Sequence, residues 1–273
     1  MLARRVATAI VLLAILLPTI FIDSPMPWGV LTLAFLGAAA WEWARLLPAA
    51  GSPWKAAAIV VVLSAVGLGW RLQAEWPVLP LKLLVAGLVL FWICIGPLRL
   101  RRHDSHQGGW VLAVLLLFGC WLALYELRVR GAVPLLSSLM VVWVADIAAY
   151  FCGRAWGRRK LAPAISPGKS WEGAVGGAMA VVTVSVVIAN IPALSESLQA
   201  ILLGRSGLAI GVMGLIAITA LSIVGDLHES LLKRQAGVKD SSQLLPGHGG
   251  VLDRIDALIP AMPAALLIYL VLT

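Results

Sequence analysis

The sequence has 273 residues, a formal net charge of +8 and a mean hydropathy of +0.96, and only 12% of its residues are charged. Soluble domains carry about 25% charged residues, so this composition excludes a soluble globular protein. The apolar residues form long continuous runs instead of short alternating segments, which excludes a membrane β-barrel and predicts an all-α, polytopic helix bundle in lipid.

Nine apolar runs follow one another along the chain, and we interpret them as about nine transmembrane helices. They cover residues 6–22, 28–47, 56–70, 78–96, 110–127, 132–151, 174–194, 208–224 and 257–273. The first run is followed by no small-residue cleavage site, so we interpret it as an uncleaved span. Glu42 and Arg45, near the end of the second run, are three residues apart on one helix face. They are either functional residues or, as we expect, a local pair near the lipid headgroups.

The charges predict the orientation of the chain. With the N-terminus in the cytoplasm, most of the 21 Lys and Arg residues fall in cytoplasmic segments, as the positive-inside rule requires. Both polar segments of the second half, residues 153–173 and 225–256, then face the cytoplasm. Because the basic residues lie in loops between spans, they indicate membrane orientation and contact with anionic lipid, and we expect no nucleic-acid partner.

The segment 225–256 gathers charges beside membrane-length runs, which indicates a functional site. If the preceding helix continues, Asp226, Ser230 and Lys233 lie on one face, whereas Glu229 supports the helix through Lys233. Gly237 is predicted to end this helix, and a loop rich in glycine follows at residues 246–250.

A second helix is predicted to start near Val251, with Asp253 and Asp256 on one of its faces. Carboxylates at two helix ends with basic residues beside them suit a Mg²⁺–phosphate site, for which Asp226, Asp253, Asp256 and Asp240 are the candidate metal ligands. The alternative is a solvated loop in which these Asp residues only cap helices.

The segment 153–173 adds a second basic cluster on the same face. Ser166-Pro167 has the pattern of a helix start, which would place Lys169 and Ser170 where the helix dipole favours anions. A phosphate-binding Walker loop is excluded, because Pro163 stands where that motif needs glycine. Asp146 and Tyr150 are four residues apart in the sixth run, and they form either a functional pair or a buried polar pair.

At this point the residues resemble those of the phosphatidate cytidylyltransferases (CDP-diacylglycerol synthases). The family signature matches at Ser230, Lys233-Arg234, Lys239-Asp240, Pro246, His248-Gly249-Gly250, Asp253-Arg254 and Asp256. A second family pattern matches at Asp146, Ala149-Tyr150, Gly153, Ser166-Pro167, Lys169 and Glu172-Gly173, with Gly168 and Ser170 departing from the commonest residues. The resemblance covers residues 140 to 260.

The resemblance implies transfer of CMP from CTP to phosphatidate, giving CDP-diacylglycerol and pyrophosphate, in the bacterial cytoplasmic (inner) membrane. It implies Mg²⁺, a second cation such as K⁺, and a homodimer. We expect an in-line attack of the lipid phosphate on the α-phosphorus of CTP. The expected catalytic residues are Asp226, Lys233, Asp253 and Asp256, and the expected substrate-binding residues are Lys169, Ser170, Ser230, Arg234, Lys239, His248, Arg254, Asp146 and Tyr150. Residues 132–273 then form the catalytic membrane domain, and residues 1–131 form spans for lipid and subunit contacts.

Two other functions are compatible with parts of this pattern. A CTP-dependent kinase of a membrane lipid such as a polyprenol would share the nucleotide and cation chemistry, but the complete signature argues against it. A transporter with charged gates would place paired charges at mid-membrane positions, whereas here they gather at one membrane face.

Overall fold

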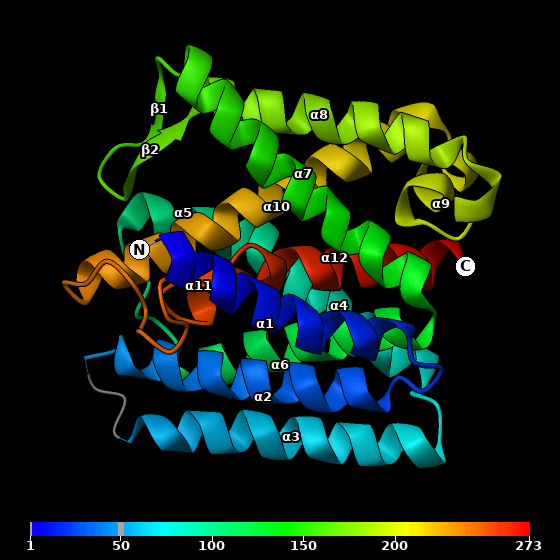
Figure 1. Cartoon of the computed structure of the whole chain (residues 1–273), viewed down its shortest axis with the longest axis horizontal. Helices are drawn as coiled ribbons and strands as arrows, with labels where there is room; N and C mark the ends of the chain where they lie inside the picture. The colour runs from blue at the N-terminus through cyan, green and yellow to red at the C-terminus, as the bar shows by residue number, and fades with distance from the viewer. Residues whose placement is uncertain (1, 49–51) are drawn as a thin grey trace.

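The computed structural model describes residues 2–48 and 52–273, and within them nearly all of the regular structure is α-helical (Figure 1). The helices are α1 (Leu2–Phe21), α2 (Met26–Arg45), α3 (Pro53–Gln73), α4 (Val78–Leu90), α5 (Gly96–Arg102), α6 (Gly109–Val129), α7 (Ala132–Trp156), α8 (Trp171–Ala189), α9 (Leu198–Arg205), α10 (Leu208–Gln235), α11 (Leu252–Ile255) and α12 (Leu258–Leu272). A π-helical turn, Phe91–Ile95, joins α4 to α5, and a 3-10 turn, Pro192–Leu194, precedes α9.

Seven helical segments in the described part of the chain are long and apolar enough to cross a membrane. They are Pro53–Gln73, Val78–Arg102, Gly109–Val129, Ala132–Trp156, Trp171–Ala189, Leu208–Gln235 and Leu252–Leu272. The first two predicted runs also form helices, α1 and α2, but the apolar part of α1, Val6–Phe21, is shorter and α2 is not among the seven. A polytopic helical membrane protein is therefore confirmed, whereas nine spans and a cytoplasmic N-terminus stay predictions.

The most buried helix of the bundle is α6, which packs against α2, α3, α4 and α12. Its Trp121 and Tyr125 are fully buried, and their rings are stacked with centroids 5.4 Å apart. The last helix, α12, packs against α4, α6 and α10, and α11 packs against α2. The C-terminal helices therefore lie inside a bundle to which the first half of the chain contributes directly.

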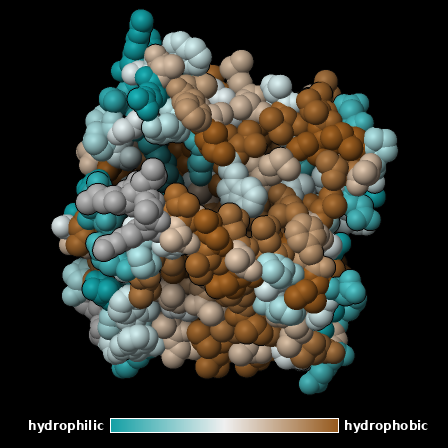
Figure 2. All heavy atoms as spheres, in the orientation of Figure 1, coloured by the Kyte–Doolittle hydropathy of each residue, from teal (hydrophilic) through white to brown (hydrophobic). Residues whose placement is uncertain are grey.

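The two ends of the bundle differ. The β1–β2 hairpin, α5, α11 and the C-terminal end of α10 gather at the left in Figure 1, where α1 also begins, whereas α12 finishes at the opposite end. Figure 2 shows hydrophobic side chains over the middle of this face and hydrophilic ones toward both ends. An apolar belt between polar ends is the surface that a lipid-embedded bundle presents.

The segment between α7 and α8 differs from the sequence prediction. Residues Ser166–Ser170 form a strand, β2, which pairs antiparallel with β1 (Lys160–Ala162), so Ser166-Pro167 does not start a helix. Helix α8 starts at Trp171, and the Ser170 hydroxyl caps it by accepting the Gly173 N–H at 3.1 Å. The pairing of β1 with β2, which sets Lys160 opposite Ser170, provides hydrogen-bond partners for backbone N–H and C=O groups of residues 166–170. In a helix these groups would have bonded to one another.

Candidate active site at one end of the bundle

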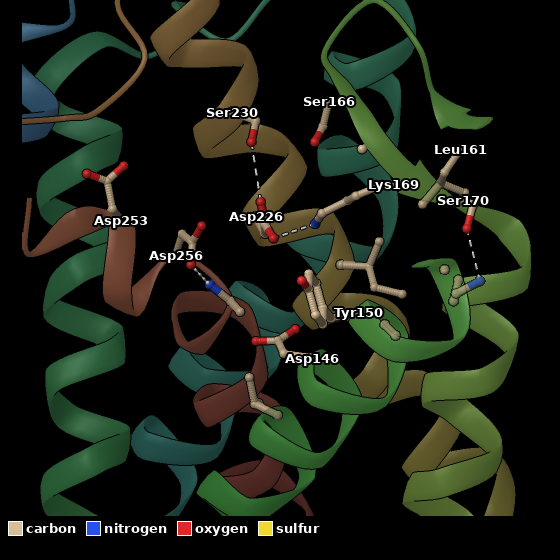
Figure 3. A pocket seen from close by; sticks show the side chains of 18 of the residues that line it. Asp146, Tyr150, Leu161, Ser166, Lys169, Ser170, Asp226, Ser230, Asp253 and Asp256 are labelled. Carbon is tan, nitrogen blue, oxygen red and sulfur yellow. Dashed lines mark hydrogen bonds and ion pairs between the residues drawn. The ribbon is translucent and has the colours of Figure 1, made fainter. Parts of the chain in front are cut away.

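A cavity of about 770 Å³ lies between α7, the β1–β2 hairpin, α10 and the α11–α12 segment (Figure 3). All of the residues predicted for the site line it except His248. They are Asp146, Tyr150, Lys169, Ser170, Asp226, Ser230, Lys233, Arg234, Lys239, Asp240, Asp253, Arg254 and Asp256. The two polar segments of the sequence, separated by two predicted spans, therefore line the same cavity.

Helix α10 supplies one wall of the cavity because it runs on past its apolar part to Gln235. Asp226, Ser230 and Lys233 share one face of it, and the Ser230 hydroxyl lies 3.3 Å from Asp226 Oδ1. Gly237, with a φ of +72°, follows the end of this helix, as the sequence predicts.

The close approach of α10 to α12 brings Asp226 beside Asp256. At Gly225 a Cβ atom would lie 2.5 Å from the Asp256 carbonyl oxygen and 2.7 Å from Pro260 Cγ. Only glycine allows the two backbones to come this close. The glycine that precedes Asp226 in the sequence is therefore needed for the geometry of the site.

Lys233 lines the cavity and links α10 to α11. Its Nζ lies 2.5 Å from Asp253 Oδ1 and also forms an ion pair with Glu229, one turn earlier on α10. The side chains of Glu229 and Asp253 are only 3% and 6% exposed. One ammonium group thus serves two buried carboxylates, so Lys233 fixes the two helices relative to each other before any phosphate is bound.

The second oxygen of Asp253 holds the glycine-rich loop. Asp253 Oδ2 accepts the Gly250 N–H at 2.7 Å and the Ser241 N–H at 3.0 Å, and it lies 3.0 Å from the Ser241 hydroxyl. Both oxygens of Asp253 are therefore bound to protein donors. Asp253 thereby holds the loop and Lys233 in place. A role of Asp253 in catalysis through these two partners is compatible with the prediction.

The hairpin carries Lys169 to the cavity. Ile165, at the hairpin turn, is buried against Leu227 and Leu231 of α10, which seats the hairpin on that helix. Lys169 Nζ then lies 2.5 Å from Asp226 Oδ2. Lys169 therefore reaches the site from the end of β2, two residues before α8 begins, and Ser170 lines the cavity with its hydroxyl engaged as the N-cap of α8.

Helix α7 contributes the remaining carboxylate. Asp146 lies at the floor of the cavity with Tyr150 beside it, and Asp146, Asp226 and Asp256 face a common space (Figure 3). Asp146 and Asp256 both interact electrostatically with Asp226 and with Lys169. Lys169 acts on all three carboxylates and Lys233 acts on Asp256 as well, so the carboxylates outnumber the lysines, and such a group repels itself unless a further cation joins it.

The other predicted residues lie around the opening. Arg234, Lys239, Asp240 and Arg254 are exposed at the cavity rim, and Arg254 Nε donates to the His248 carbonyl at 3.0 Å. His248 itself does not line the cavity, so its contribution in this structure is to hold Arg254 through the backbone. A rim with three basic side chains attracts an anionic substrate.

The carboxylates fit a Mg²⁺ ion only in part. Among residues 2–48 and 52–273, no three His, Cys, Asp or Glu side chains converge to enclose a metal. Mg²⁺ does not need such an enclosure, because it is commonly held by one or two carboxylates, water and substrate phosphate. Asp226 and Asp256 suit that role. In the part of the chain that the structure describes, the side chain of Asp226 is 31% exposed and is bound by only Lys169 and Ser230, and Asp256 Oδ1 accepts only the Ala257 N–H, whereas the side chain of Asp253 is buried among several protein donors and Asp240 lies at the rim.

Two acidic residues near the site lie outside the predicted set. Glu229 pairs with Lys233 four residues later, as the sequence predicts, and the structure adds that the Glu229 side chain is buried. Glu42, predicted to pair with Arg45 near the headgroups, is fully buried and accepts the Leu252 N–H at 2.6 Å, whereas Arg45 lies over the Trp41 ring. The signal for Glu42 was its place in an otherwise apolar run.

Comparison with known proteins gives the family of this chain. The model of the cytidylyltransferase family matches residues 3–272. A phosphatidate cytidylyltransferase of Pseudomonas aeruginosa is 39% identical over 98% of this chain and 97% of its own length, and one of Haemophilus influenzae is 34% identical over 96% of each. One from Brucella melitensis is 45% identical over 59% of this chain and 56% of its own length.

The family model and the first two relatives cover nearly the whole chain, so they include the N-terminal helices as well as the two polar segments that line the cavity. They agree with the activity predicted from the sequence, and they leave the metal and the roles of single residues as predictions. The chain belongs to the cytidylyltransferase family and is a membrane-spanning, CTP-using nucleotidyltransferase.

Proposed function

We propose that this enzyme is a phosphatidate cytidylyltransferase whose cavity holds CTP and phosphatidate together. A phosphatidate oxygen attacks the α-phosphorus of CTP, the bond to the β-phosphate breaks, and pyrophosphate leaves as CDP-diacylglycerol forms. The observation that carries the proposal is the lining of one cavity by acidic, basic and apolar side chains in a chain of this family. No protein nucleophile is required, because the lipid phosphate supplies the attacking oxygen.

The basic residues bind the phosphates in this proposal. Lys169 closes one side of the cavity, and Arg234, Lys239 and Arg254 surround its opening. Lys233 keeps its two carboxylate partners and places a positive charge beneath the reacting groups. Positioning and charge stabilisation of this kind provide most of the catalysis in reactions at phosphorus.

A divalent cation, with Mg²⁺ as the expected one, would neutralise the phosphate charge and polarise the reacting phosphorus when bound. Asp226 and Asp256 would hold it, and Asp146 lies within the same acidic group. A second cation such as K⁺ belongs to the same proposal. The excess of carboxylates over ammonium groups at the cavity floor is the feature that supports it.

The lipid reaches the phosphates from the membrane side. Val142, Trp143, Ile223 and Leu258 give the cavity an apolar wall, and Trp143 is 49% exposed on the outside of α7. This wall suits the part of phosphatidate next to its headgroup. We place the cavity at the cytoplasmic face of a bacterial inner membrane, where CTP is available, because the basic residues gather there.

Transfer of label tests the proposed function. The protein in nanodiscs is given phosphatidate with CTP labelled at the α- or the γ-phosphate. We expect α-label in the lipid product and γ-label in pyrophosphate. Label that reaches lipid only from the γ-phosphate would instead make the protein a lipid kinase. The homodimer, which the family resemblance implies, is tested on the same particles by their mass.

A further inference from the structure

Glu42 lies on α2, far in sequence from every residue that lines the cavity, and it binds the segment that carries the site. Its carboxylate accepts the Val251 N–H at 3.0 Å and the Leu252 N–H at 2.6 Å. The hydroxyl of Ser241 lies 3.2 Å from Glu42 Oε2, and the hydroxyl of Ser242 donates to Oε1. The side chain has no exposed surface. Glu42 thus meets four donors from one segment, residues 241–252.

Two of these donors belong to the start of a helix. Val251 and Leu252 stand where α11 begins, and the first N–H groups of a helix have no partner within it. A carboxylate at this position satisfies them. Glu42 therefore fixes the point from which the chain enters the turn that carries Asp253 and Asp256.

A shared hydroxyl connects Glu42 to the charged residues of the site. Ser241 Oγ lies between Glu42 Oε2, at 3.2 Å, and Asp253 Oδ2, at 3.0 Å. The loop is thus held by two carboxylates, Glu42 of α2 and Asp253 of α11. Lys233 in turn binds the other oxygen of Asp253.

Gly250 gives an independent sign that Glu42 shapes this segment. A Cβ atom at Gly250 would lie 2.6 Å from Glu42 Oε1 and 2.0 Å from Ser241 Oγ. The carboxylate from α2 occupies the space that any larger residue at this position would need. A glycine of the signature is therefore explained by a residue that lies outside the signature.

We propose that Glu42 is a positioning residue for the transfer reaction: it docks segment 241–252 onto α2 and, through Ser241, sets the position of Asp253 and Lys233. The proposal rests on the proposed function, because it concerns the rate of the same reaction. Glu42 does not line the cavity. We therefore expect its substitution to lower kcat and to change the KM for CTP or phosphatidate much less.

Kinetics of Glu42→Gln, Ser241→Ala and the double variant test the proposal. Residues that orient groups of an active site typically change activity by about 10–100-fold, and we expect kcat losses of that size for Glu42→Gln with KM values within about threefold. Because both residues act through Asp253, the loss in the double variant falls well short of the product of the single losses. Losses that multiply would overturn the proposal. Glu75→Gln, whose side chain is 89% exposed, is the matched control and keeps full kcat.

Hydrogen exchange without substrate gives a readout independent of turnover. In Glu42→Gln we expect faster exchange in segment 241–252, whereas α6 stays protected; unchanged exchange in that segment would overturn the proposal. If Glu42→Gln does not fold, Ser241→Ala decides, and full kcat in that variant is the contradicting result. Wild-type protein that transfers no CMP would refute the proposed function, and the exchange measurement would still decide whether Glu42 docks the segment.

Discussion

Lys169 Nζ lies 2.5 Å from Asp226 Oδ2, so the hairpin and α10 are joined by an ion pair that spans the cavity. Both side chains remain partly exposed, at 26% and 31%. A substrate phosphate and a cation that enter together can each take one partner of this pair. The ion pair therefore keeps a phosphate-binding group and a carboxylate next to the position where the substrates meet.

The first prediction concerns Lys169. We expect Lys169→Ala to raise the KM for CTP or phosphatidate by about tenfold, since a charge-assisted hydrogen bond contributes about 1.5–3 kcal/mol. Folding should be preserved, because the lysine is half-buried and the hairpin is held by Ile165. Steady-state kinetics in nanodiscs measure the effect, with the exposed Lys55→Ala as control. Unchanged kinetics in Lys169→Ala would remove this residue from the binding site.

The second prediction concerns the metal. Chelation should abolish turnover and Mg²⁺ should restore it, and Asp226→Asn or Asp256→Asn should lower kcat by about 100-fold or more, since each removes a carboxylate from a metal–phosphate site. Binding of Mn²⁺ followed by electron paramagnetic resonance gives a second readout, in which both variants bind more weakly. Asp23→Asn, at an exposed position, serves as control. Activity that survives chelation, or wild-type Mn²⁺ binding in both variants, would contradict the proposed metal site.

The third prediction separates stability from catalysis at Lys233. Lys233→Met leaves two buried carboxylates without their cation, and breaking a buried pair in this way costs about 3–5 kcal/mol. We therefore expect a clear fall in the melting temperature measured in detergent. The double variant Glu229→Gln/Lys233→Met should recover part of that loss but no activity. A melting temperature in the double variant no higher than in the single one would argue against the shared ion pair.

The fourth prediction tests the close approach of α10 and α12. Gly225→Ala forces a methyl group to within 2.5 Å of the Asp256 carbonyl oxygen, and overpacking of this kind costs about 1–3 kcal/mol. We expect lower thermal stability together with reduced activity, because Asp256 moves with the backbone. Gly69→Ala is the matched control: its Cβ meets nothing within 4 Å, so stability should be equal or slightly higher. Full activity in Gly225→Ala would show that the spacing is not needed.

Much of the architecture follows from the sequence because lipid leaves few choices. Long apolar runs must be helices, so each predicted run matches a helix of the structure. The shared face of Asp226, Ser230 and Lys233 follows from helical spacing once α10 continues past its apolar part. The number of crossings does not follow in the same way, because α1 and α2 are near the limits of length and apolarity.

Local patterns failed where a distant partner decided the structure. Ser166-Pro167 has the pattern of a helix start, but pairing with β1 makes it a strand. Glu42 has a basic residue three positions away, yet its partners are some 209 and 210 residues further along the chain. Spacing along one helix indicates which residues share a face and cannot indicate which other helix meets that face. The misinterpretation at Glu42 has this cause.

The docking of segment 241–252 on Glu42 also has a consequence for how the protein is made. Chains are synthesised from the N-terminus, so α2 is made long before Val251 and Leu252 exist. A buried carboxylate without donors is costly in an apolar environment, and Glu42 has none of its final donors during that interval. The last helices of the chain bring them. The same step therefore completes the active site and removes the free-energy cost of the unpaired Glu42 carboxylate. A chain that ends within α10 keeps this cost and lacks the residues that complete the site.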